Sequence, residues 1–416
     1  MNDILPEEAR RFQRVERIFR ETVELYGYRE LRTPIVEELA LFHKSTGETS
    51  EVVQKQMFLL DHSEKLALRP EGTPSAARVY IGESQHAREP VTKWYYIGPM
   101  FRAERPQRGR YRQFHQAGCE LYGDPSPTAD AEMLDMLYQL ATRLGLKDVK
   151  IQVNSLDGPD ARRLSRAKLI EYFGARKAAL SAHAQARLGD NPLRILDSKD
   201  PRDQEASQGA PILLDVLTED DKKHWESLLA ALDALGTPYE IDPRLVRGLD
   251  YYTRTCFELL AQSGEIGSQN AVLGGGRYDG MLAGLGGQDQ PAIGFAMGLE
   301  RLLLAIGDFE IEESPLCFIV PLGEKAAQRA LVLARDLRAD GIRVEVDGRD
   351  NSLKSKLRRA DGMQARVALV LGDSEVERGV AQLKNLSAHT QAEVPFAEIT
   401  RHVAEALQAP KDEASA

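Results

Sequence analysis

The sequence predicts an α+β protein in which an antiparallel sheet flanked by helices is interrupted by a helical insertion and followed by a separate α/β domain. Two apolar runs flank a basic loop at residues 102–112, as expected for a β-hairpin. Residues 157–234 combine Ala, Arg, Lys and Asp with helical spacing of apolar positions. Beyond residue 315, strands alternate with helices, which is typical of a small parallel-sheet domain.

At 416 residues, the chain is too long for one ordinary core. We expect four segments: the first part of the sheet domain at 1–156, the insertion at 157–235, the second part of the sheet domain at 236–312, and the α/β domain at 315–410. A hydrophobic content of 42% and a charged content of 28% indicate a soluble globular protein. No apolar run approaches the roughly 18 residues of a membrane span. Since the N-terminus shows no secretory signal, we expect a cytoplasmic protein.

Three scattered cysteines are too few for a disulfide framework or a zinc cluster. We expect Cys119, Cys256 and Cys317 to be small buried hydrophobic residues in a reducing compartment. The eight histidines show no metal-ligand spacing, and we expect no tightly bound protein metal.

The first third of the chain alternates helices and short strands. Apolar spacing predicts a helix over 8–26 that ends at Gly27. A strand over 28–36 is interrupted by Pro34, which places it at a sheet edge or an interface. The remaining expected elements are strands at 55–60 and 65–69 joined by a polar turn, a helix from Thr73, the basic hairpin, a helix at 128–144 and a strand at 149–154.

After the insertion, the sheet pattern returns at residue 238. Strands are expected at 244–260 and 272–276, followed by an apolar segment at 292–306 and a linker at 309–315. The last domain should contain strands at 316–321, 342–346 and 366–371, helices at 325–340 and 352–363, and a disordered tail at 411–416.

The basic loop is the most informative segment. The whole chain carries a net charge of −10, yet this loop holds five arginines against one acid, Glu104. The arginines are Arg102, Arg105, Arg108, Arg110 and Arg112. Guanidinium groups bind phosphate or carboxylate through two hydrogen bonds at once, so phosphate is the first candidate ligand. The alternative is a solvated charged loop, but Pro106 and Gly109 favour a defined turn.

Residues 32–34, 101–104 and 294–301 are similar to motifs 1, 2 and 3 of the class II aminoacyl-tRNA synthetases. More specific are Leu-Val-Arg-Gly-Leu-Asp-Tyr-Tyr at 245–252 and Gly-Gly-Gly-Arg-Tyr-Asp-Gly at 274–280, which are similar to two histidine-specific signatures of that class. Through these segments, the chain resembles the bacterial histidyl-tRNA synthetases from Asn2 almost to its C-terminus. The resemblance implies the class II catalytic sheet, an anticodon-binding C-terminal domain, and transfer of histidine, activated with ATP as histidyl-adenylate, to the 3′ end of tRNA(His).

The implied reaction brings a carboxylate to the α-phosphorus of ATP, so fixed cations are needed. The resemblance implies that Arg102 binds the α-phosphate, Arg301 the γ-phosphate side, and Arg110 the nucleotide from the motif 2 loop. Glu104 would lie near the adenine or the metal. Arg247 would face Arg102 and take over part of the role usually given to a metal ion. Mg²⁺ is still expected to bridge the β- and γ-phosphates.

Histidine requires acceptors for its ammonium group and partners for both ring nitrogens. The resemblance implies a pocket formed by Glu71, Thr73 and Gln116 for the ammonium group, and by Glu120, Arg247, Tyr251, Tyr252 and Tyr278 around the imidazole. A buried polar partner can discriminate by roughly 10⁴–10⁵ against an analogue that leaves it unpaired, so no editing domain is expected. Asp250 and Asp279 either hold this wall or are purely structural. His115 is expected to be a hairpin residue.

For tRNA, the resemblance implies that Arg105 and Gln107 at the loop tip reach the acceptor end. A basic helix face of Lys354, Lys356, Arg358 and Arg359 would bind the anticodon; a solvated helix face is the alternative. A homodimer through motif 1 around Pro34 is expected, and no membrane partner. The family usually has a short strand before Asn2, so an added upstream segment should raise thermal stability.

Two other functions compete with this interpretation. The first is the catalytically inactive regulatory paralogue of ATP phosphoribosyltransferase, which loses active-site arginines and the anticodon domain. The presence of Arg102, Arg247 and Arg301 disfavours it. The second is a module that senses uncharged tRNA, which would require an effector domain. A dinucleotide loop at Gly274–Gly276 is excluded by the wrong glycine spacing and by the lack of a surrounding βαβ unit.

Overall fold

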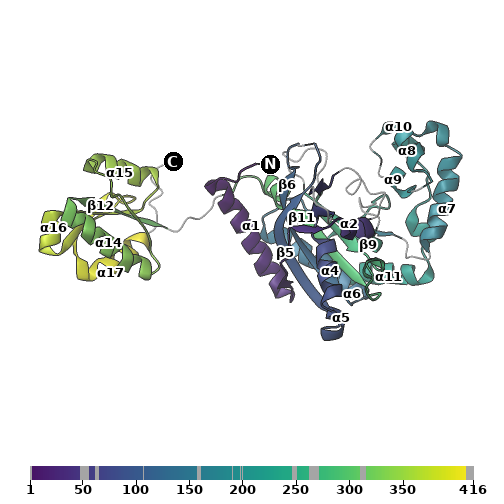
Figure 1. The fold of residues 1–416 in the computed structure, drawn as a ribbon, viewed down its shortest axis with the longest axis horizontal. Helices are drawn as coiled ribbons and strands as arrows, with labels where there is room; N and C mark the ends of the chain where they lie inside the picture. Colours follow the sequence, from purple (N-terminus) through teal and green to yellow (C-terminus); the bar gives the residue numbers. More distant parts are fainter. Residues whose placement is uncertain are drawn as a thin grey trace. The chain divides into compact units, whose positions relative to one another are not determined.

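The computed structural model describes residues 2–46, 56–60, 65–105, 107–156, 161–189, 191–196, 198, 200–245, 251–261, 271–309 and 315–408. The chain forms two compact units, Met1–Ile311 and Glu312–Ala416 (Figure 1). Several expected features lie outside the described residues, namely the turn at 61–64, Pro106, residues 246–250 of the first histidine signature, most of the linker, and the tail.

A mixed, mainly antiparallel sheet forms the centre of the first unit, and within the described residues it has eight strands. In spatial order they are β1 (Arg29–Glu30), β5 (Thr92–Phe101), β6 (Gln113–Tyr122), β11 (Ala292–Gly298), β10 (Ala271–Arg277), β9 (Thr253–Leu260), β7 (Lys150–Leu156) and β8 (Tyr239–Ile241). The two outermost pairs are parallel and the inner pairs antiparallel. The antiparallel sheet predicted from the sequence is confirmed.

Helices α1 (Pro6–Leu25), α6 (Pro127–Arg143), α11 (Glu219–Leu235) and α13 (Leu299–Ile306) contribute to one core with the sheet. The apolar stripe of α1 is buried as its spacing predicts. This helix ends at the expected glycine: Gly27 has φ +82°, and the amide of Tyr28 donates to the carbonyl of Val23 at 3.2 Å. That geometry is a Schellman C-cap.

A second, smaller sheet holds β2 (Val36–Glu38), β4 (Leu66–Leu68) and β3 (Phe58–Leu59). Nearby are α2 (Leu39–Thr46), α4 (Thr73–Gly82), α5 (Gln85–Arg88) and α12 (Met281–Gly284). The single strand expected at 28–36 is wrong, because β1 and β2 belong to different sheets. Between β1 and β2, the buried Arg69 guanidinium donates hydrogen bonds to the carbonyl oxygens of Thr33 at 2.9 Å and Pro34 at 3.3 Å. These two carbonyl groups therefore do not pair with a neighbouring strand.

The helical insertion shares a small core with the main sheet, since its apolar side chains pack with Leu156 of β7 and Cys256 of β9. Its helices are α7 (Ala161–Gly174), α8 (Ala182–Arg187), α9 (Leu193–Leu196) and α10 (Pro201–Ala206). Helix α11, which was expected to belong to the same segment, instead buries Trp225, Leu228 and Leu232 in the core of the main sheet. The boundaries of the insertion at 157–235 stay a prediction.

The second unit has a five-stranded sheet within its described residues, ordered β13 (Arg343–Val346), β12 (Leu316–Leu322), β14 (Val367–Gly372), β15 (Val380–Asn385) and β16 (Thr390–Pro395). Its helices are α14 (Glu324–Ala339), α15 (Leu353–Gly362), α16 (Asp373–Arg378) and α17 (Ile399–Gln408). The first three strands are parallel as predicted. The expectation of a purely parallel domain is wrong, since β15 and β16 form an antiparallel hairpin. Strand β16 is mostly exposed and so lacks an apolar pattern.

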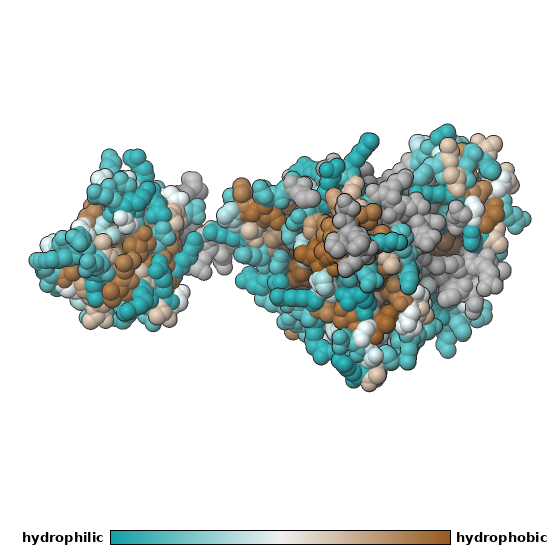
Figure 2. Space-filling model, viewed as in Figure 1, coloured by the Kyte–Doolittle hydropathy of each residue, from teal (hydrophilic) through white to brown (hydrophobic). Residues whose placement is uncertain are grey.

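All three cysteines are buried thiols, which confirms their predicted role as small core residues. Within the described residues, no helix combines the length and apolar character needed to cross a membrane. On the face seen in Figure 2, hydrophilic residues surround both units, and hydrophobic residues gather near α4 on the first unit.

Candidate active site

On one face of the main sheet, glycines leave room for the side chains of the neighbouring strands. In the register of β5, β6 and β11, Tyr96 lies opposite Gly118, and Glu120 lies opposite Gly294. A methyl group added to Gly118 would come within 2.6 Å of the Tyr96 ring, and one on Gly72 of α4 within 2.2 Å. The tyrosine ring therefore occupies a slot that only glycine on both sides permits.

Glu120 is a fully buried carboxylate in this part of the sheet. The Thr73 hydroxyl donates to its Oε1 at 2.6 Å, and the Tyr278 hydroxyl donates to Oε2 at 2.5 Å. The Tyr96 hydroxyl is 3.4 Å from Oε1. Hydroxyl groups from the first residue of α4, from β5 and from the residue after β10 thus surround one acid. A buried acid without a cationic partner is costly, so this arrangement is suited to a ligand rather than to stability.

Burial raises the pKa of Glu120 to about 8, although the hydroxyl donors from Thr73, Tyr278 and Tyr96 favour its charged form. The nearby carboxylate of Glu71 raises this pKa further. A ligand that brings positive charge or an N–H donor would relieve both effects. The strongly perturbed acid among polar side chains marks this region as a functional site.

Two tyrosines from the start of β9 close the same pocket. The Tyr251 hydroxyl is 3.4 Å from Glu71 Oε2, and the Tyr251 ring lies 5.7 Å from that of Tyr278. Tyr252 packs beside Tyr251, with 4.6 Å between ring centroids. On the opposite side, the side-chain oxygen of Gln116 accepts from the Gly72 amide at 3.0 Å.

Seven of the residues that the sequence predicted for histidine binding are therefore described, and a series of contacts around Glu120 and Glu71 brings them together. They are Glu71, Thr73, Gln116, Glu120, Tyr251, Tyr252 and Tyr278. The eighth, Arg247, lies outside the described residues, as does Asp250. Which contacts these side chains make with a ligand remains a prediction.

The predicted hairpin arginines are held at the end of the sheet next to this pocket. Arg102 donates through Nε to the Pro70 carbonyl at 2.9 Å, and its guanidinium lies 5.2 Å from the centre of the Phe114 ring. Within the described part of the chain, its terminal nitrogens make no further hydrogen bond. Arg102 is therefore fixed in direction while its terminal nitrogens remain able to grip an anion.

Arg301 and Arg110 bring two like charges together. Burial lowers the pKa of Arg301, the positive charge of Arg110 lowers it further, and Glu258 opposes this effect. Arg110 also pairs with Glu104 at 3.7 Å. An anion bound here would interact with both guanidinium groups, which makes this a candidate polyanion site.

The hairpin loop turns sharply and touches α13. The backbones of Gln107 and Arg110 pair across the tip, and Gly109 has φ +74°. A methyl group on Gly109 would meet Leu304 at 3.0 Å. The side chains of Arg105 and Gln107 are exposed, so they can meet a large partner.

His115 is a hairpin residue, as expected. Both carboxylate oxygens of Glu300 accept from its backbone amide at 2.9 Å, and its ring Nδ1 lies 3.0 Å from Glu300 Oε1. This hydrogen bond raises the pKa of His115. The contact ties β6 to the first turn of α13, which carries Arg301.

A buried ionic network behind the pocket was not predicted from the sequence. Arg277, which precedes Tyr278, is fully buried and pairs with Asp130 of α6 and with Asp279 at 3.3 Å. His224 of α11 adds a contact to Asp130 at 2.9 Å. Asp279 also accepts from the amide of Ala292 at 3.0 Å, so it braces the pocket wall from behind.

The basic face predicted on α15 needs correction. Lys356 is only 4% exposed, and its ammonium donates to the carbonyls of Pro321 at 2.7 Å and Asp347 at 3.1 Å. Arg359 is half-buried and pairs with Glu345 at 2.7 Å. Lys356 and Arg359 thus serve the packing of the domain, and of the predicted four only Lys354 and Arg358 are exposed.

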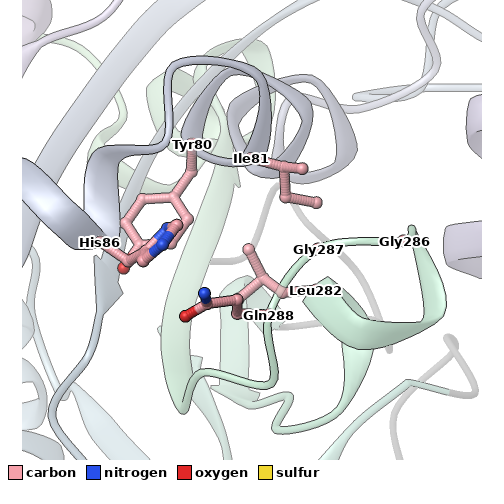
Figure 3. A pocket seen from close by; sticks show the side chains of 7 residues that line it. All are labelled: Tyr80, Ile81, His86, Leu282, Gly286, Gly287 and Gln288. Carbon is pink, nitrogen blue, oxygen red and sulfur yellow. The ribbon is translucent and has the colours of Figure 1, made fainter.

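A separate cavity of ≈ 310 Å³ lies between α4, α5 and the loop after α12. Figure 3 shows the side chains of Tyr80, His86, Leu282 and Gln288 facing it. Among the described residues, its lining includes none of the side chains predicted for histidine binding. Tyr80 connects the two regions, since its ring stacks on Tyr122 with 4.4 Å between centroids.

Comparison with known proteins agrees with this geometry. Residues 1–302 match the family model described as histidyl-tRNA synthetase, and residues 316–406 match the one described as an anticodon binding domain. The protein named histidine–tRNA ligase from Sorangium cellulosum is 52% identical over 412 residues, covering 99% of this chain and 96% of its own. The protein of the same name from Geobacter sulfurreducens is 45% identical and covers 95% of this chain and 96% of its own.

Solved structures share the fold. The crystal structure of apo histidyl-tRNA synthetase from S. aureus has a TM-score of 0.82 and 34% identity, covering 97% of each chain. A structure described as an ATP phosphoribosyltransferase regulatory subunit/histidyl-tRNA synthetase from Bacillus halodurans has a TM-score of 0.65 and 23% identity over 89% of this chain and 97% of its own, a likeness of fold alone. On the strength of the family match and the 52% identity, the chain belongs to the histidyl-tRNA synthetase family.

Proposed function

We propose that this protein activates L-histidine with ATP to form histidyl-adenylate and then transfers the histidyl group to the 3′ end of tRNA(His). The observation that carries the proposal is Glu120, a buried acid with a pKa of about 8 that is surrounded by hydroxyl groups and faces a second acid, Glu71. A pocket with two buried acids is suited to a small ligand that carries both an ammonium group and a ring with N–H donors.

Histidine binding would proceed through charge compensation. The ammonium group supplies a positive charge beside Glu71, Thr73 and Gln116, and this charge lowers the pKa of Glu120. The ionised Glu120 then accepts a hydrogen bond from the imidazole. Tyr252 would complete the polar contacts of the ring, and Tyr251 and Tyr278 would enclose it. An analogue without ring nitrogens would leave Glu120 buried and unpaired, which is the basis of specificity.

The arginines would hold ATP next to this pocket. Arg102 would bind the α-phosphate, while Arg110 and Arg301 would share the remaining phosphate charge. This role accounts for the electrostatic influence of Arg110 on Arg301. Arg247 would complete the clamp opposite Arg102 and contact the histidine carboxylate. Attack of that carboxylate on the α-phosphorus expels pyrophosphate, and the fixed cations stabilise the charge that spreads over the phosphate oxygens.

Mg²⁺ would arrive with ATP, bound to the β- and γ-phosphates. Among the described residues, no group of three or more His, Cys, Asp or Glu side chains is placed to hold a metal ion by itself. Carboxylate oxygens suit Mg²⁺, and Glu104 and Glu258 provide them beside Arg110 and Arg301. When bound, the ion would neutralise phosphate charge.

Transfer requires the tRNA to reach both units. Arg105 and Gln107, exposed at the hairpin tip, would contact the acceptor end. In the second unit, Lys354 and Arg358 remain as exposed cations that could bind the anticodon region. Phosphate contacts from exposed cations weaken with added salt, so tRNA binding by these residues should depend on ionic strength.

A homodimer is proposed to form through the motif 1 region. Exposed apolar side chains lie on the small sheet and beside it: Ile35 is 41% exposed and Leu59 is 61% exposed. Arg69 fixes the backbone around Pro34 from within. Sedimentation of a variant with Ile35 and Leu59 changed to Asp would test this interface. A dimer that persists in that variant would contradict it.

The regulatory paralogue is disfavoured. The anticodon-binding match covers residues 316–406, and Arg102 and Arg301 are present in the pocket region. Histidine-dependent exchange of pyrophosphate into ATP separates the two functions, because a regulatory subunit would not catalyse it. Within that assay, we expect Arg247→Ala to abolish exchange while the protein stays dimeric. Exchange at the wild-type rate in this variant would contradict the role of Arg247.

A further inference from the structure

The start of β9 contains a bulge between the two histidine signatures. Cys256 pairs with Gly276 of β10, but the next β10 residue, Arg277, pairs with Thr253. Arg254 and Thr255 are therefore extra residues on this side of β9. On the other side, the register with β7 runs on through Arg254 without a break. Bulges of this kind bend a strand and re-aim the neighbouring side chains.

Arg254 adopts a backbone conformation that arginine disfavours. Its φ is +49°, in the left-handed region where glycine is normally found. A non-glycine residue persists there only when its surroundings hold it. Asp221 of α11 provides this hold: its Oδ1 accepts from Arg254 Nε at 2.8 Å, and its side chain is only 4% exposed.

The two neighbours of Arg254 are also anchored. The Thr253 hydroxyl oxygen accepts from the amide of Asp279 at 3.1 Å, directly after Tyr278. The Thr255 hydroxyl donates to Asp130 at 2.6 Å, and Asp130 in turn holds Arg277. Three consecutive side chains thus fasten the bulge to α11, to the second signature and to α6.

The bulge sets the relation between the two walls of the proposed histidine pocket. Tyr251 and Tyr252 precede it, whereas Gly276 and Tyr278 lie across it. The fit is tight, because a methyl group on Gly276 would come within 2.8 Å of the Tyr252 ring. A regular β9 would flip or shift the tyrosines relative to Tyr278.

We propose that Arg254 is a positioning residue for histidine recognition. Its ion pair with Asp221 holds the left-handed bulge that places Tyr251 and Tyr252 against the pocket. Because α11 follows the helical insertion in the chain, the same pair links that helix to the pocket wall. This inference rests on the proposed function and adds to it a residue that would act through the tyrosines beside it.

The test compares Arg254→Gly with Asp148→Gly in the full-length protein. Glycine suits the left-handed backbone at both positions, and Asp148 has the same φ of +49° in an exposed turn before β7. In Arg254→Gly, the left-handed backbone is no longer strained, but the hydrogen bond to Asp221 that held it is lost. We expect Arg254→Gly to raise the KM for histidine about tenfold in pyrophosphate exchange, with the KM for ATP within twofold of wild type. Asp148→Gly should change neither value.

Arg254→Lys keeps a cation within reach of Asp221 and should recover most of the histidine KM. A structural role alone would instead lower the thermal midpoint and affect both substrates equally. A histidine KM within twofold of wild type in both Arg254→Gly and Asp221→Asn would overturn the inference while leaving the proposed function intact. Absence of exchange in the wild-type protein would overturn the proposed function, and the inference with it.

Discussion

Gly294 of β11 lies directly opposite Glu120 of β6, and a methyl group at Gly294 would come within 1.9 Å of Glu120 Oε2. The same methyl group would lie 2.6 Å from the Cys119 carbonyl oxygen, which belongs to the backbone and cannot turn aside. The carboxylate at the centre of the pocket therefore depends on a glycine in the third class II motif. Motif 3 thus shapes the amino-acid pocket besides carrying Arg301.

We expect Gly294→Ala to raise the KM for histidine at least tenfold, because either Glu120 or the strand must move. Overpacking of this kind also costs about 1–3 kcal/mol of stability. Gly284→Ala in α12 is the matched control, since nothing lies within 4 Å of a methyl group there. Exchange kinetics and thermal unfolding measure both effects. Normal histidine kinetics in Gly294→Ala would show that Glu120 does not need this space.

Glu120→Gln should separate stability from function. The pKa of Glu120 rises from 4.5 to about 8 on folding, so between these values the folded state holds a proton that the unfolded chain has lost. The favourable contribution of Glu120 to the free energy of unfolding therefore falls as the pH rises from 4.5 to 8. Above pH 8 it no longer changes. Since one pKa unit corresponds to about 1.4 kcal/mol, the free energy of unfolding decreases by at most about 5 kcal/mol over this pH range.

Glutamine carries no charge, so the variant should match wild type near pH 5 and exceed it in stability near pH 8.5, while losing histidine-dependent exchange. Chemical denaturation at several pH values measures the difference between the two proteins. If that difference does not change with pH, Glu120 does not titrate as the buried acid described here.

Arg301→Ala should reduce kcat/KM for ATP by about 10²–10³, because one preorganised donor to the transition-state charge is lost. The KM for histidine should change little. Arg17→Ala is a suitable control, since the Arg17 side chain on α1 is 69% exposed. The expected pattern also requires that Arg301→Lys remain impaired, because an ammonium group cannot grip a phosphate through two hydrogen bonds. Full activity of Arg301→Lys would argue for a simple charge effect.

Lys356→Met should destabilise the protein by about 2 kcal/mol or more, because two buried carbonyls lose a charged donor. Lys354→Met should leave stability unchanged and weaken tRNA binding, with a smaller dependence on salt. Thermal unfolding and the KM for tRNA in aminoacylation distinguish the two positions. If both variants lost the same tRNA affinity and kept their stability, Lys356 would have to contact the tRNA itself.

The position of Lys356 could have been predicted from the sequence. Leu353, Lys356, Leu357 and Ala360 are spaced as i, i+3, i+4 and i+7, the pattern of the buried side of a helix. The charge of Lys356 favours an exposed position on the helix, whereas its place in this pattern favours a buried one. Long side chains can bury their stem when carbonyls meet the ammonium group, and Pro321 and Asp347 supply them.

The basic hairpin and the clustering of the side chains proposed to bind histidine were predictable because local patterns and family motifs carry them. The supporting network was not, since its contacts join distant parts of the chain. Asp130 and Arg277 are 147 positions apart, and nothing near either residue indicates the other. The bulge at Arg254 is equally hidden, because a left-handed arginine has no local sequence signal. Tertiary contacts determine the conformations of these residues, and the same contacts support the proposed pocket.

Histidine-dependent exchange of pyrophosphate into ATP tests the central claim most directly, with each amino acid supplied separately to the full-length protein. The account predicts exchange with histidine alone, which disappears in Glu120→Ala although the variant remains folded. Exchange with another amino acid, or none with histidine in a folded preparation, would contradict the claim that this pocket recognises an imidazole next to bound ATP.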